Sequence, residues 1–426
     1  MLNKKIYMKN IFILVFILFC FNLLLAQDNS KKIIAGAERL NVYLPLIKDK
    51  SVGIFANQTS VVGNSHLVDT LLKRGVNVKV IFGPEHGFRG SADAGEKVGN
   101  YVDEKTGIPV ISLYGPKRRP SAEDLKDIDI LIFDIQDVGV RFYTFISSLQ
   151  EFMEAAFENS KPLLLLDRPN PNGHYVDGPV LEPMYKSFVG MQPVPIVYGM
   201  TLAEYAFMIA GEKWLTEKAN EKYSYYQTTN ISADTLFHFQ VIKCKNYSHS
   251  SLYELPIKPS PNLPTIQSIY SYPSTCFFEG TVLSEGRGTD YPFQIFGHPS
   301  LPNNLFSFTP TSRDGAKTPK LLNKECFGWN ITGTKEEVYN KINRKIQLHW
   351  LIEAFKLFPD KENFFIKPKK ENAQAQDYFF NKLAGNGTLM NQIKQSLPED
   401  DIRKSWEPGL TQFKEIRKKY LLYEDF

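Results

Sequence analysis

The sequence predicts an α/β protein, with a Rossmann-like, doubly wound parallel sheet followed by a smaller α+β domain. The first half of the chain contains five short apolar runs, and patterns typical of helices separate several of them. Hydrophobicity in these runs is continuous rather than alternating, as in parallel strands that are covered on both faces. The chain has 426 residues, which is too long for one ordinary core and indicates two domains. The expected strands are residues 51–55, 76–82, 108–113, 128–133 and 162–166.

Helix signals accompany these runs. Ser121 to Asp124 and Thr201 to Glu204 match the capping box, in which the first side chain and the fourth exchange hydrogen bonds with backbone N–H groups. Apolar residues recur at helical spacing from Phe142 to Phe157, which predicts an amphipathic helix. On this interpretation Glu204 is a helix cap rather than a catalytic residue.

A cluster of prolines marks the passage between domains. Pro259, Pro261, Pro264 and Pro273 follow one another closely, and a chain of that composition crosses between units rather than continuing a helix. We therefore expect a catalytic domain over residues 27–270 and an auxiliary domain over residues 271–426. A helix is expected in the second domain near residues 346–358.

The N-terminus has the order of a secretory signal. Lysines precede an apolar run, and Ala26 ends it before polar residues begin. The run is short for a membrane span, which needs about 20 residues, so we expect cleavage after residue 26 and an exported protein, periplasmic or secreted. The alternative is an uncleaved anchor. Loss of residues 1–26 lowers the formal net charge from +4 to +1, which gives no electrostatic reason to expect a nucleic-acid partner.

Several kinds of chemistry lack their motifs. The chain has no G-x-G-x-x-G for a dinucleotide, no G-x-S-x-G nucleophile elbow and no H-E-x-x-H. Its seven histidines and four cysteines show no metal-ligand spacing, and the cysteines form no disulfide framework. We therefore expect neither a cofactor nor a metal, with a single metal held by His86 and nearby carboxylates as the weaker alternative. The sequence leaves the oligomeric state open.

Three of the expected strands end in clusters of polar residues. Because parallel strands present their carboxyl ends along one edge of a sheet, these clusters are expected to converge on one crevice. The first cluster follows residues 76–82, the second follows residues 128–133, and the third follows residues 162–166. Their chemistry-bearing members are Glu85, His86 and Arg89; Asp134, Asp137 and Arg141; and Asp167, Arg168 and Asn170.

These residue types point to the cleavage of a glycosidic bond by a pair of carboxyl groups. Glu85 stands between apolar neighbours, which favour the protonated form of a carboxyl group and suit a general acid. Asp134 or Asp137 would supply the second carboxylate, and His86 either takes part or orients Glu85. Each residue also has a structural alternative, because strand-end aspartates often cap helices or pair with arginine.

Other residues suit substrate binding. A guanidinium recognises a carboxylate through two parallel hydrogen bonds, so Arg89, Arg141 and Arg168 are candidates for an acidic sugar. Beyond the proline cluster, Glu279 and Arg287 lie in a glycine-rich stretch that can close the same cleft, or can form a structural ion pair. Tyr143 and Asn170, from the second and third clusters, complete the candidate set.

Taken together, the motifs identify a family. The segments GPEHGFRG, DIQDVGVRFYTF, LDRPNPNG, PIVYGMT, PSPNLP and FEGTVLSEGRGT occur in this order between residues 83 and 289. The chain resembles the former domain-of-unknown-function family now associated with exo-acting β-N-acetylmuramidases. That resemblance implies a Rossmann-like domain, an auxiliary domain and an active site in the cleft between them. It also implies release of terminal N-acetylmuramic acid (MurNAc) from peptidoglycan fragments, with Glu85 at the position of the family's loop glutamate.

Two other functions fit the same residues. A non-catalytic periplasmic binder of cell-wall fragments would use the same pocket without breaking a bond. A hydrolase of an ester or amide bond would use similar acid and base groups.

Overall fold

The structure is a computed structural model and describes residues 32–85, 87–90, 99–228 and 237–426. The expected signal segment and His86 lie outside these residues. Among the residues described, no helix is both long enough and apolar enough to cross a membrane.

The first domain is built on a seven-stranded sheet, whose strands run in the order β5-β6-β4-β1-β7-β8-β9. From β6 to β9 every pairing is parallel, and only the edge strand β5 is antiparallel. After β1, the chain adds β4, β5 and β6 on one side of that strand, and then crosses over to add β7, β8 and β9 on its other side. This reversal of direction is typical of a Rossmann sheet. The predicted fold class is therefore confirmed. The bounds are β1 Ser51–Ala56, β4 Asn77–Gly83, β5 Tyr101–Val102, β6 Pro109–Ser112, β7 Ile130–Asp134, β8 Leu163–Leu166 and β9 Phe239–Ile242.

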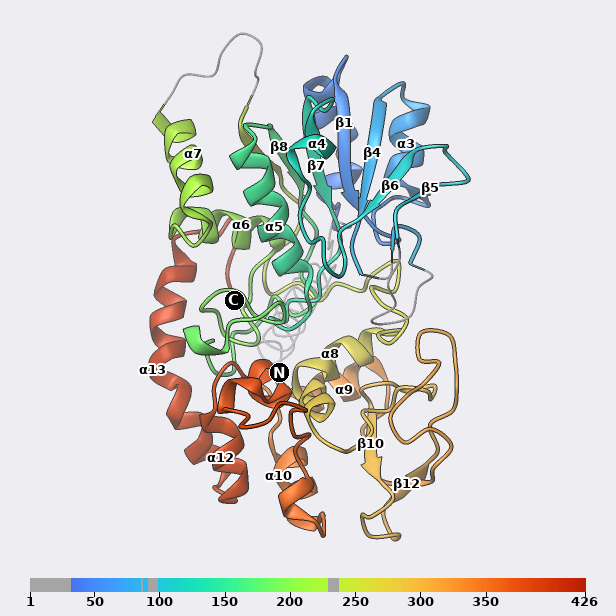
Figure 1. The fold of residues 1–426 in the computed structure, drawn as a ribbon, viewed down its shortest axis with the longest axis vertical. Coiled ribbons are helices and arrows are strands. Elements are labelled where there is room, and N and C mark those ends of the chain that lie inside the picture. Colours follow the sequence, from blue (N-terminus) through green and yellow to red (C-terminus); the bar gives the residue numbers. More distant parts are fainter. Residues whose placement is uncertain (1–31, 86, 91–98, 229–236) are drawn as a thin grey trace, which may run out of the picture.

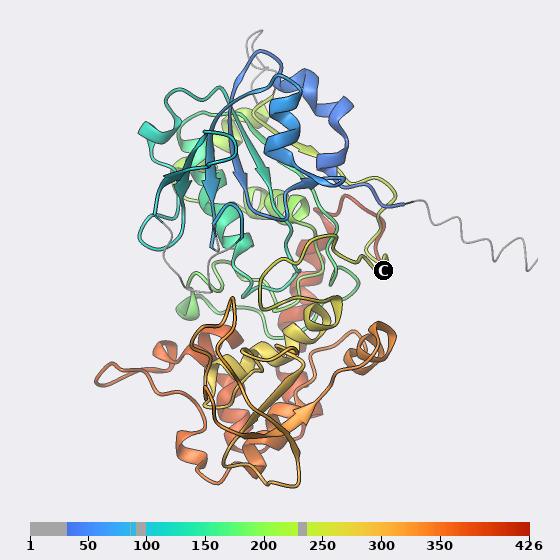
Figure 2. The ribbon, with the colours of Figure 1, turned by 90° about the vertical axis from the view of Figure 1, so that its right-hand side faces the viewer.

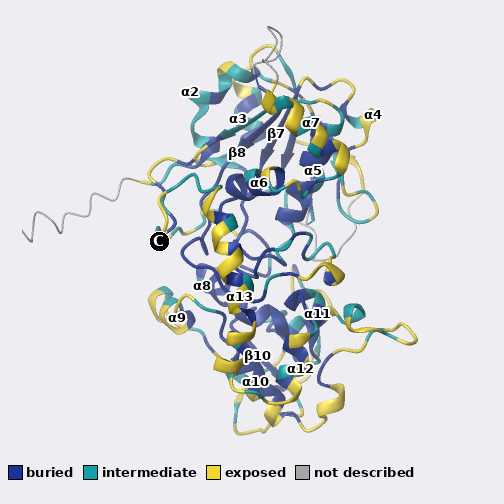
Figure 3. Ribbon diagram, turned by 90° about the vertical axis from the view of Figure 1, so that its left-hand side faces the viewer, coloured by how far each residue is buried: buried dark blue, intermediate teal, exposed yellow. Residues whose placement is uncertain are grey.

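Both faces of this sheet are buried, as continuous apolar strands require. Along β1, Ile54 contributes to one core and Phe55 to the other. One face is covered by helices that follow β7 and β8, and the other by helices near the N-terminal end (Figure 1). The covering helices are α5 Phe145–Glu158, α6 Leu202–Gly211 and α7 Glu217–Thr228 on the first face, and η1 Gly36–Glu38, α2 Leu40–Tyr43, η2 Leu44–Ile47 and α3 Leu67–Lys73 on the second. In Figure 3 the strands are dark blue between these layers.

The predicted helix signals are confirmed in their local geometry. The Ser121 hydroxyl accepts from the Asp124 N–H and the Asp124 carboxylate accepts from the Ser121 N–H, which starts α4, Ala122–Leu125. The Thr201 and Glu204 pair starts α6 in the same way. A short antiparallel pair, β2 Val61–Val62 with β3 Ser65–His66, and the 3-10 turn η3 Pro183–Tyr185 complete this domain.

One expectation from the prolines is wrong. Residues 266–275 form a helix, α8 Ile266–Thr275, and Pro273 lies inside it. A proline lacks the N–H that a helix interior uses, and here the carbonyl of Ile269, four residues earlier, accepts instead from Asn172 Nδ2 at 3.3 Å. The crossing between domains is therefore the stretch before Thr265, which caps α8.

The second domain is smaller and mixes helices with an antiparallel sheet of order β10-β12-β11 (Figure 2). The helix predicted near residues 346–358 is α10. The elements are η4 Cys276–Gly280, β10 Ile295–His298, β11 Phe306–Phe308, β12 Cys326–Asn330, α9 Lys335–Ile342, α10 His349–Leu357, η5 Lys361–Asn363, η6 Ala375–Asp377, α11 Phe379–Ala384, α12 Thr388–Lys394 and α13 Glu399–Lys418.

The last helix joins the two domains. α13 runs along one side of both in Figure 1, and its end returns to the first domain. Arg417 donates to the carbonyl of Gly199, and the Tyr423 hydroxyl donates to Asp167 at 2.6 Å. These contacts hold the two domains together on the side of the molecule formed by α13.

Candidate active site

A cavity of about 410 Å³ lies where the carboxyl edge of the sheet meets the second domain. Its walls come from loops after β4 and β6, from the loop entering α5, from the proline crossing and from the second domain. This is the position at which open α/β sheets bind ligands. The lining residues are Glu85, Tyr114, Arg118, Phe142, Tyr143, Thr144, Phe145, Phe188, Val189, Ser260, Asn262, Leu263, Tyr272, Glu279, Arg287, Phe293 and Phe379.

Glu85 presents a carboxyl group to this cavity from the loop that follows β4. The hydroxyl of Tyr114, from the loop after the neighbouring strand β6, donates to Glu85 Oε1 at 2.9 Å. The pKa of Tyr114 is raised by burial and by the charge of Glu85, so the phenol keeps its proton and acts as the donor. Two adjacent strand ends thus hold Glu85 at the cavity.

A second carboxyl group, Glu279, reaches the cavity from η4 in the other domain. Arg287 Nη2 lies 2.6 Å from Glu279 Oε1, and Arg287 Nε lies 3.4 Å from Glu285. Lys320 binds Glu285 at 2.8 Å. Acidic and basic side chains therefore alternate in the order Glu279, Arg287, Glu285 and Lys320. Burial raises the pKa of Glu279 against the opposing effect of Arg287. Burial also acts to raise the pKa of Glu285, but Lys320 and Arg287 outweigh it and hold that pKa below its usual value.

The local backbone explains how Arg287 is placed. Gly286 and Gly288 on either side have φ of 81° and 79°, in the left-handed region that favours glycine. A Cβ on either glycine would come within 2.5 Å of a backbone carbonyl oxygen. The Gly-Arg-Gly sequence is therefore needed for this turn, which supports the expectation that this stretch closes the cleft.

Phe293 on the same wall is strained. Its φ is 62°, a conformation that is costly for a bulky side chain by about 1–3 kcal/mol. Its N–H donates to the Glu285 carbonyl at 2.8 Å, and its ring meets the edge of Tyr272 at 4.8 Å. These contacts hold an aromatic ring in the cavity wall.

Tyr143 is a predicted residue that does line the cavity. Its hydroxyl donates to the Pro259 carbonyl at 2.9 Å, which ties the loop before α5 to the proline crossing. Together with Tyr114, Phe188, Tyr272 and Phe293 it makes the walls largely aromatic. Of the predicted residues that the structure describes, the cavity therefore brings together Glu85, Tyr143, Glu279 and Arg287.

Asp134 and Arg168 do not line this cavity. They form a buried bidentate pair, with Arg168 Nε 2.6 Å from Asp134 Oδ1 and Nη2 2.8 Å from Oδ2. Arg168 also donates to the carbonyl of Val61. The two residues pair because β7 and β8 are adjacent in the sheet. At this position, where we expected an open crevice, the two side chains bind each other instead of a ligand.

Asp137 is also buried away from the cavity. Its Oδ2 accepts hydrogen bonds from the Tyr198 hydroxyl and from the Gly139 N–H at 2.7 Å. Burial raises the pKa of Asp137 to about 7, with these donors acting in the opposite direction. The side chain therefore lies behind the cavity wall rather than at its surface.

The other predicted binding residues have structural partners. Arg89 makes two hydrogen bonds to Asp103, at 3.0 and 2.8 Å. Arg141 is fully buried and donates to the carbonyls of Pro179, Val194 and Leu383, the last in the second domain. Asn170 donates to the Met200 carbonyl at 2.8 Å. None of the three lines the cavity.

Sequence reasoning missed Tyr114 and Arg118, which follow a fourth strand, β6. The strand-end rule that selected the other three clusters would have found them if it had been applied to residues 108–113. Phe188 and Phe379 carry no comparable signal, because Phe188 lies in an irregular segment and Phe379 begins α11 of the second domain, and only the tertiary structure brings them to the cavity.

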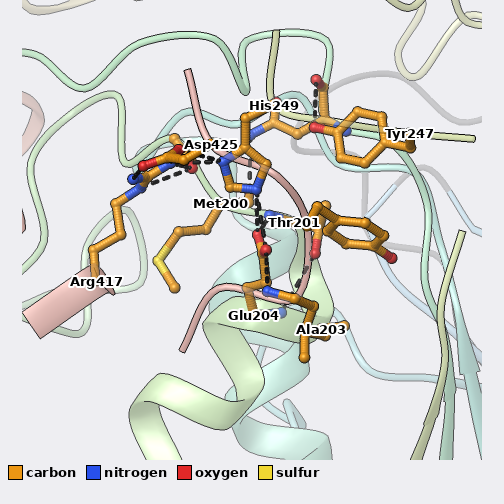
Figure 4. A network of polar contacts seen from close by, with 12 residues as sticks. Met200, Thr201, Ala203, Glu204, Tyr247, His249, Arg417 and Asp425 are labelled. Carbon is orange, nitrogen blue, oxygen red and sulfur yellow. Dashed lines mark hydrogen bonds and ion pairs between the residues drawn. The ribbon is translucent and has the colours of Figure 1, made fainter. Parts of the chain in front are cut away.

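A separate buried cluster contains residue types that are common in active sites (Figure 4). His249 Nε2 lies 2.9 Å from Glu204, and Arg417 Nη2 lies 2.6 Å from His249 Nδ1. Asp425 accepts from Arg417 through both of its oxygens. Glu204, His249 and Arg417 are almost wholly buried, and none lines the cavity. Their contacts attach the C-terminal tail to α6.

Comparison with known proteins defines the class. The model of the N-terminal domain of exo-β-N-acetylmuramidase NamZ matches residues 52–267, and that of its C-terminal domain matches residues 270–423. The chain belongs to this family, a family of glycosidases. It is 38% identical over 401 residues to the peptidoglycan β-N-acetylmuramidase NamZ of Bacillus subtilis strain 168, covering 89% of each chain.

Solved structures agree with this assignment. A DUF1343 family protein from Bacteroides fragilis NCTC 9343 is 44% identical, with a TM-score of 0.79 over 93% of this chain and 100% of the other. A second such protein from the same organism is 28% identical, with a TM-score of 0.72 over 92% of this chain and 99% of the other. Both support the two-domain fold described above.

Proposed function

We propose that this protein is an exported exo-acting β-N-acetylmuramidase, which releases terminal MurNAc from peptidoglycan fragments, with Glu85 as its general acid. The observation that carries the proposal is the position of Glu85. Its carboxyl group lines an aromatic cavity of about 410 Å³, a volume suited to a small ligand. The relative from Bacillus subtilis, which is named as a peptidoglycan β-N-acetylmuramidase, supports the choice of substrate.

The proposed reaction needs one proton at the leaving oxygen. Glu85 in its protonated form transfers this proton to the glycosidic oxygen as the bond from that oxygen to C1 breaks. The remainder of the fragment leaves with a new hydroxyl group. Water then supplies OH to C1 of MurNAc, and its other proton restores the acid. The Tyr114 hydroxyl holds the carboxyl group in position through this cycle.

The walls of the cavity serve binding. Aromatic rings pack against the apolar faces of a sugar and exclude water, which strengthens electrostatic interactions inside. Glu279, on the opposing domain, also lines the cavity, where its carboxyl group is paired with Arg287. Because each domain contributes one carboxyl group, the site requires both domains.

Export rests on the N-terminal pattern of lysines, an apolar run and Ala26. We expect the mature protein to begin near Gln27. Mass spectrometry of the exported protein tests this, and a peptide that extends to Met1 would show that the segment is retained.

Activity is tested with an aryl β-glycoside of MurNAc and with a peptide-free disaccharide that has MurNAc at its non-reducing end. Release of MurNAc from both supports the proposal. Binding of the disaccharide without release would favour the cell-wall-fragment binder. Cleavage of an aryl ester or anilide alone would favour an ester or amide hydrolase.

A further inference from the structure

An enzyme that acts on MurNAc must distinguish it from N-acetylglucosamine (GlcNAc), which lacks the lactyl carboxylate. A guanidinium is the side chain best matched to a carboxylate, because it offers two parallel N–H donors. The three arginines expected for this purpose already bind other groups of the protein. Arg89 and Arg168 are paired with aspartates, and Arg141 is surrounded by carbonyl groups.

Among the residues that the structure describes, two arginines line the cavity, and their surroundings differ. Arg287 lies between Glu279 and Glu285, and its charge is neutralised inside the wall. Arg118 follows β6, and no carboxylate lies within ion-pair distance of it among the residues described. Its guanidinium carbon stands 4.2 Å from the centre of the Phe188 ring. Its only hydrogen bond in the described part of the chain is a long one, from Nε to the Gly115 carbonyl at 3.4 Å.

This arrangement leaves the terminal nitrogens of Arg118 without a hydrogen bond to any of the described residues, so their N–H groups can bind a ligand. Stacking on Phe188 restrains the flat guanidinium without using its N–H groups. The side chain is exposed at the rim, on the same β6 loop as Tyr114, which holds Glu85. A carboxylate on the sugar bound at Glu85 therefore meets a cation that has no competing acid beside it.

We infer that Arg118 binds the lactyl carboxylate of MurNAc and determines the preference of the site for MurNAc over GlcNAc. The inference rests on the proposed function, because it takes the cavity as the binding site for MurNAc. It assigns Arg118 the role that the sequence had suggested for Arg89, Arg141 or Arg168.

The test compares Arg118→Met and Arg118→Lys with the wild type on aryl β-glycosides of MurNAc and GlcNAc. A charge-assisted pair at a partly solvated rim contributes about tenfold in affinity. Arg118→Met is expected to raise KM for the MurNAc glycoside by about this factor, with little change in kcat and none for the GlcNAc glycoside. For Arg118→Lys, KM for the MurNAc glycoside should lie between the values of the wild type and Arg118→Met, since lysine keeps the charge but lacks the two parallel N–H donors.

Lys117→Met is the matched control. It removes a positive charge from the neighbouring residue, but Lys117 is paired with Asp124 at 2.6 Å and does not line the cavity. Its ratio of kcat/KM for the MurNAc glycoside to kcat/KM for the GlcNAc glycoside should equal that of the wild type. The inference would be overturned if Arg118→Met showed the same ratio of kcat/KM for the two glycosides as the wild type. It would also be overturned if Lys117→Met and Arg118→Met lost the same amount of kcat/KM on the MurNAc glycoside.

Calorimetric titration separates the possible carboxylates and does not need turnover. Free MurNAc carries the lactyl carboxylate, whereas in muramyl dipeptide that group is an amide and only the peptide carries a carboxylate. Weaker binding of free MurNAc by Arg118→Met supports the inference. A loss confined to the dipeptide would overturn it in favour of a peptide carboxylate. If the wild type cleaves no MurNAc glycoside, the proposed function fails, and this titration still decides the role of Arg118.

Discussion

The cavity and the cluster in Figure 4 contain similar side chains in opposite circumstances. In the cluster, Glu204 accepts hydrogen bonds from the Thr201 and Leu422 N–H groups and from His249. At the cavity, Glu85 receives the Tyr114 hydroxyl and also borders open space. The cluster attaches the C-terminal tail to the first domain, whereas the cavity lies between the two domains.

The difference teaches that residue type does not distinguish a catalytic group from a structural one. A buried acid whose oxygens are occupied by donors stabilises the fold, because removal of any partner leaves an unpaired polar group. An acid that lines a cavity can exchange a proton with a ligand. Substitutions in the two regions should therefore separate activity from stability.

The largest expected effect is the loss of turnover in Glu85→Gln. The amide keeps the shape of the side chain and can still accept from Tyr114, but it has no proton to transfer. General acid assistance contributes about 10²–10⁴-fold, so kcat on the natural disaccharide should fall by this factor at unchanged Tm. Glu123→Gln, on the surface, is the control. Near-wild-type turnover by folded Glu85→Gln would assign the acid to another carboxyl group, with Glu279 the next candidate.

The opposite result is expected for Glu204→Ala. Removing this carboxylate leaves His249 and two backbone N–H groups buried without their acceptor, which typically costs about 3–5 kcal/mol. Denaturant unfolding should show this loss, while kcat per folded molecule stays near that of the wild type. Glu204→Gln, which retains one acceptor oxygen, should lose less. A large fall in kcat without a loss of stability would place this cluster in the catalytic machinery.

Asp137 provides a pH-dependent comparison. Burial raises its pKa from 3.8 to about 7, so the folded state binds the proton more tightly than the unfolded state. Its contribution to stability is therefore complete below about pH 4 and is lost as the pH rises to about 7. Asp137→Asn cannot ionise, and its carbonyl oxygen can accept from Tyr198 and Gly139.

Asp137→Asn should accordingly gain stability relative to the wild type between pH 4 and pH 8, by about 1–4 kcal/mol. Chemical unfolding at several pH values measures the difference. Asp167 remains in the variant, and burial raises its pKa to about 7 as well. Part of the decrease in wild-type stability with rising pH should therefore persist. Parallel stability curves for the variant and the wild type would contradict the prediction.

The smallest effect is expected for Tyr114→Phe. The ring remains, but Glu85 loses a hydrogen bond of the kind that contributes about 1 kcal/mol, so kcat should fall by about threefold to tenfold. Tyr225→Phe, on the exposed face of α7 and away from the cavity, serves as the control. An unchanged kcat would show that Tyr114 only fills space.

Much of the fold could be predicted from local pattern. The five expected strands correspond to β1, β4, β6, β7 and β8, because continuous apolar runs can only be buried on both faces. Thr201 and Glu204 marked the start of α6 because capping depends on neighbours three residues apart. β9 was missed, since Phe239–Ile242 is short and only partly buried along most of its length.

The candidate site was predicted in part. Strand-end position selected Glu85, which lines the cavity, but it also selected Asp134 and Arg168, which bind each other. Their sequence separation is 34 residues, and nothing in either segment states that the two side chains face one another. Tyr114 and Arg118 follow the same rule and were overlooked.

The sequence by itself determined the family, five strands of the parallel sheet and the presence of acids and bases at the carboxyl edge of the sheet. These depend on local periodicity, on turn chemistry and on ordered motifs. Only the tertiary structure decided which charges are neutralised and which line the cavity. That outcome depends on which strands are adjacent and where the second domain closes, since β7 beside β8 pairs Asp134 with Arg168, whereas β4 beside β6 brings Tyr114 to Glu85.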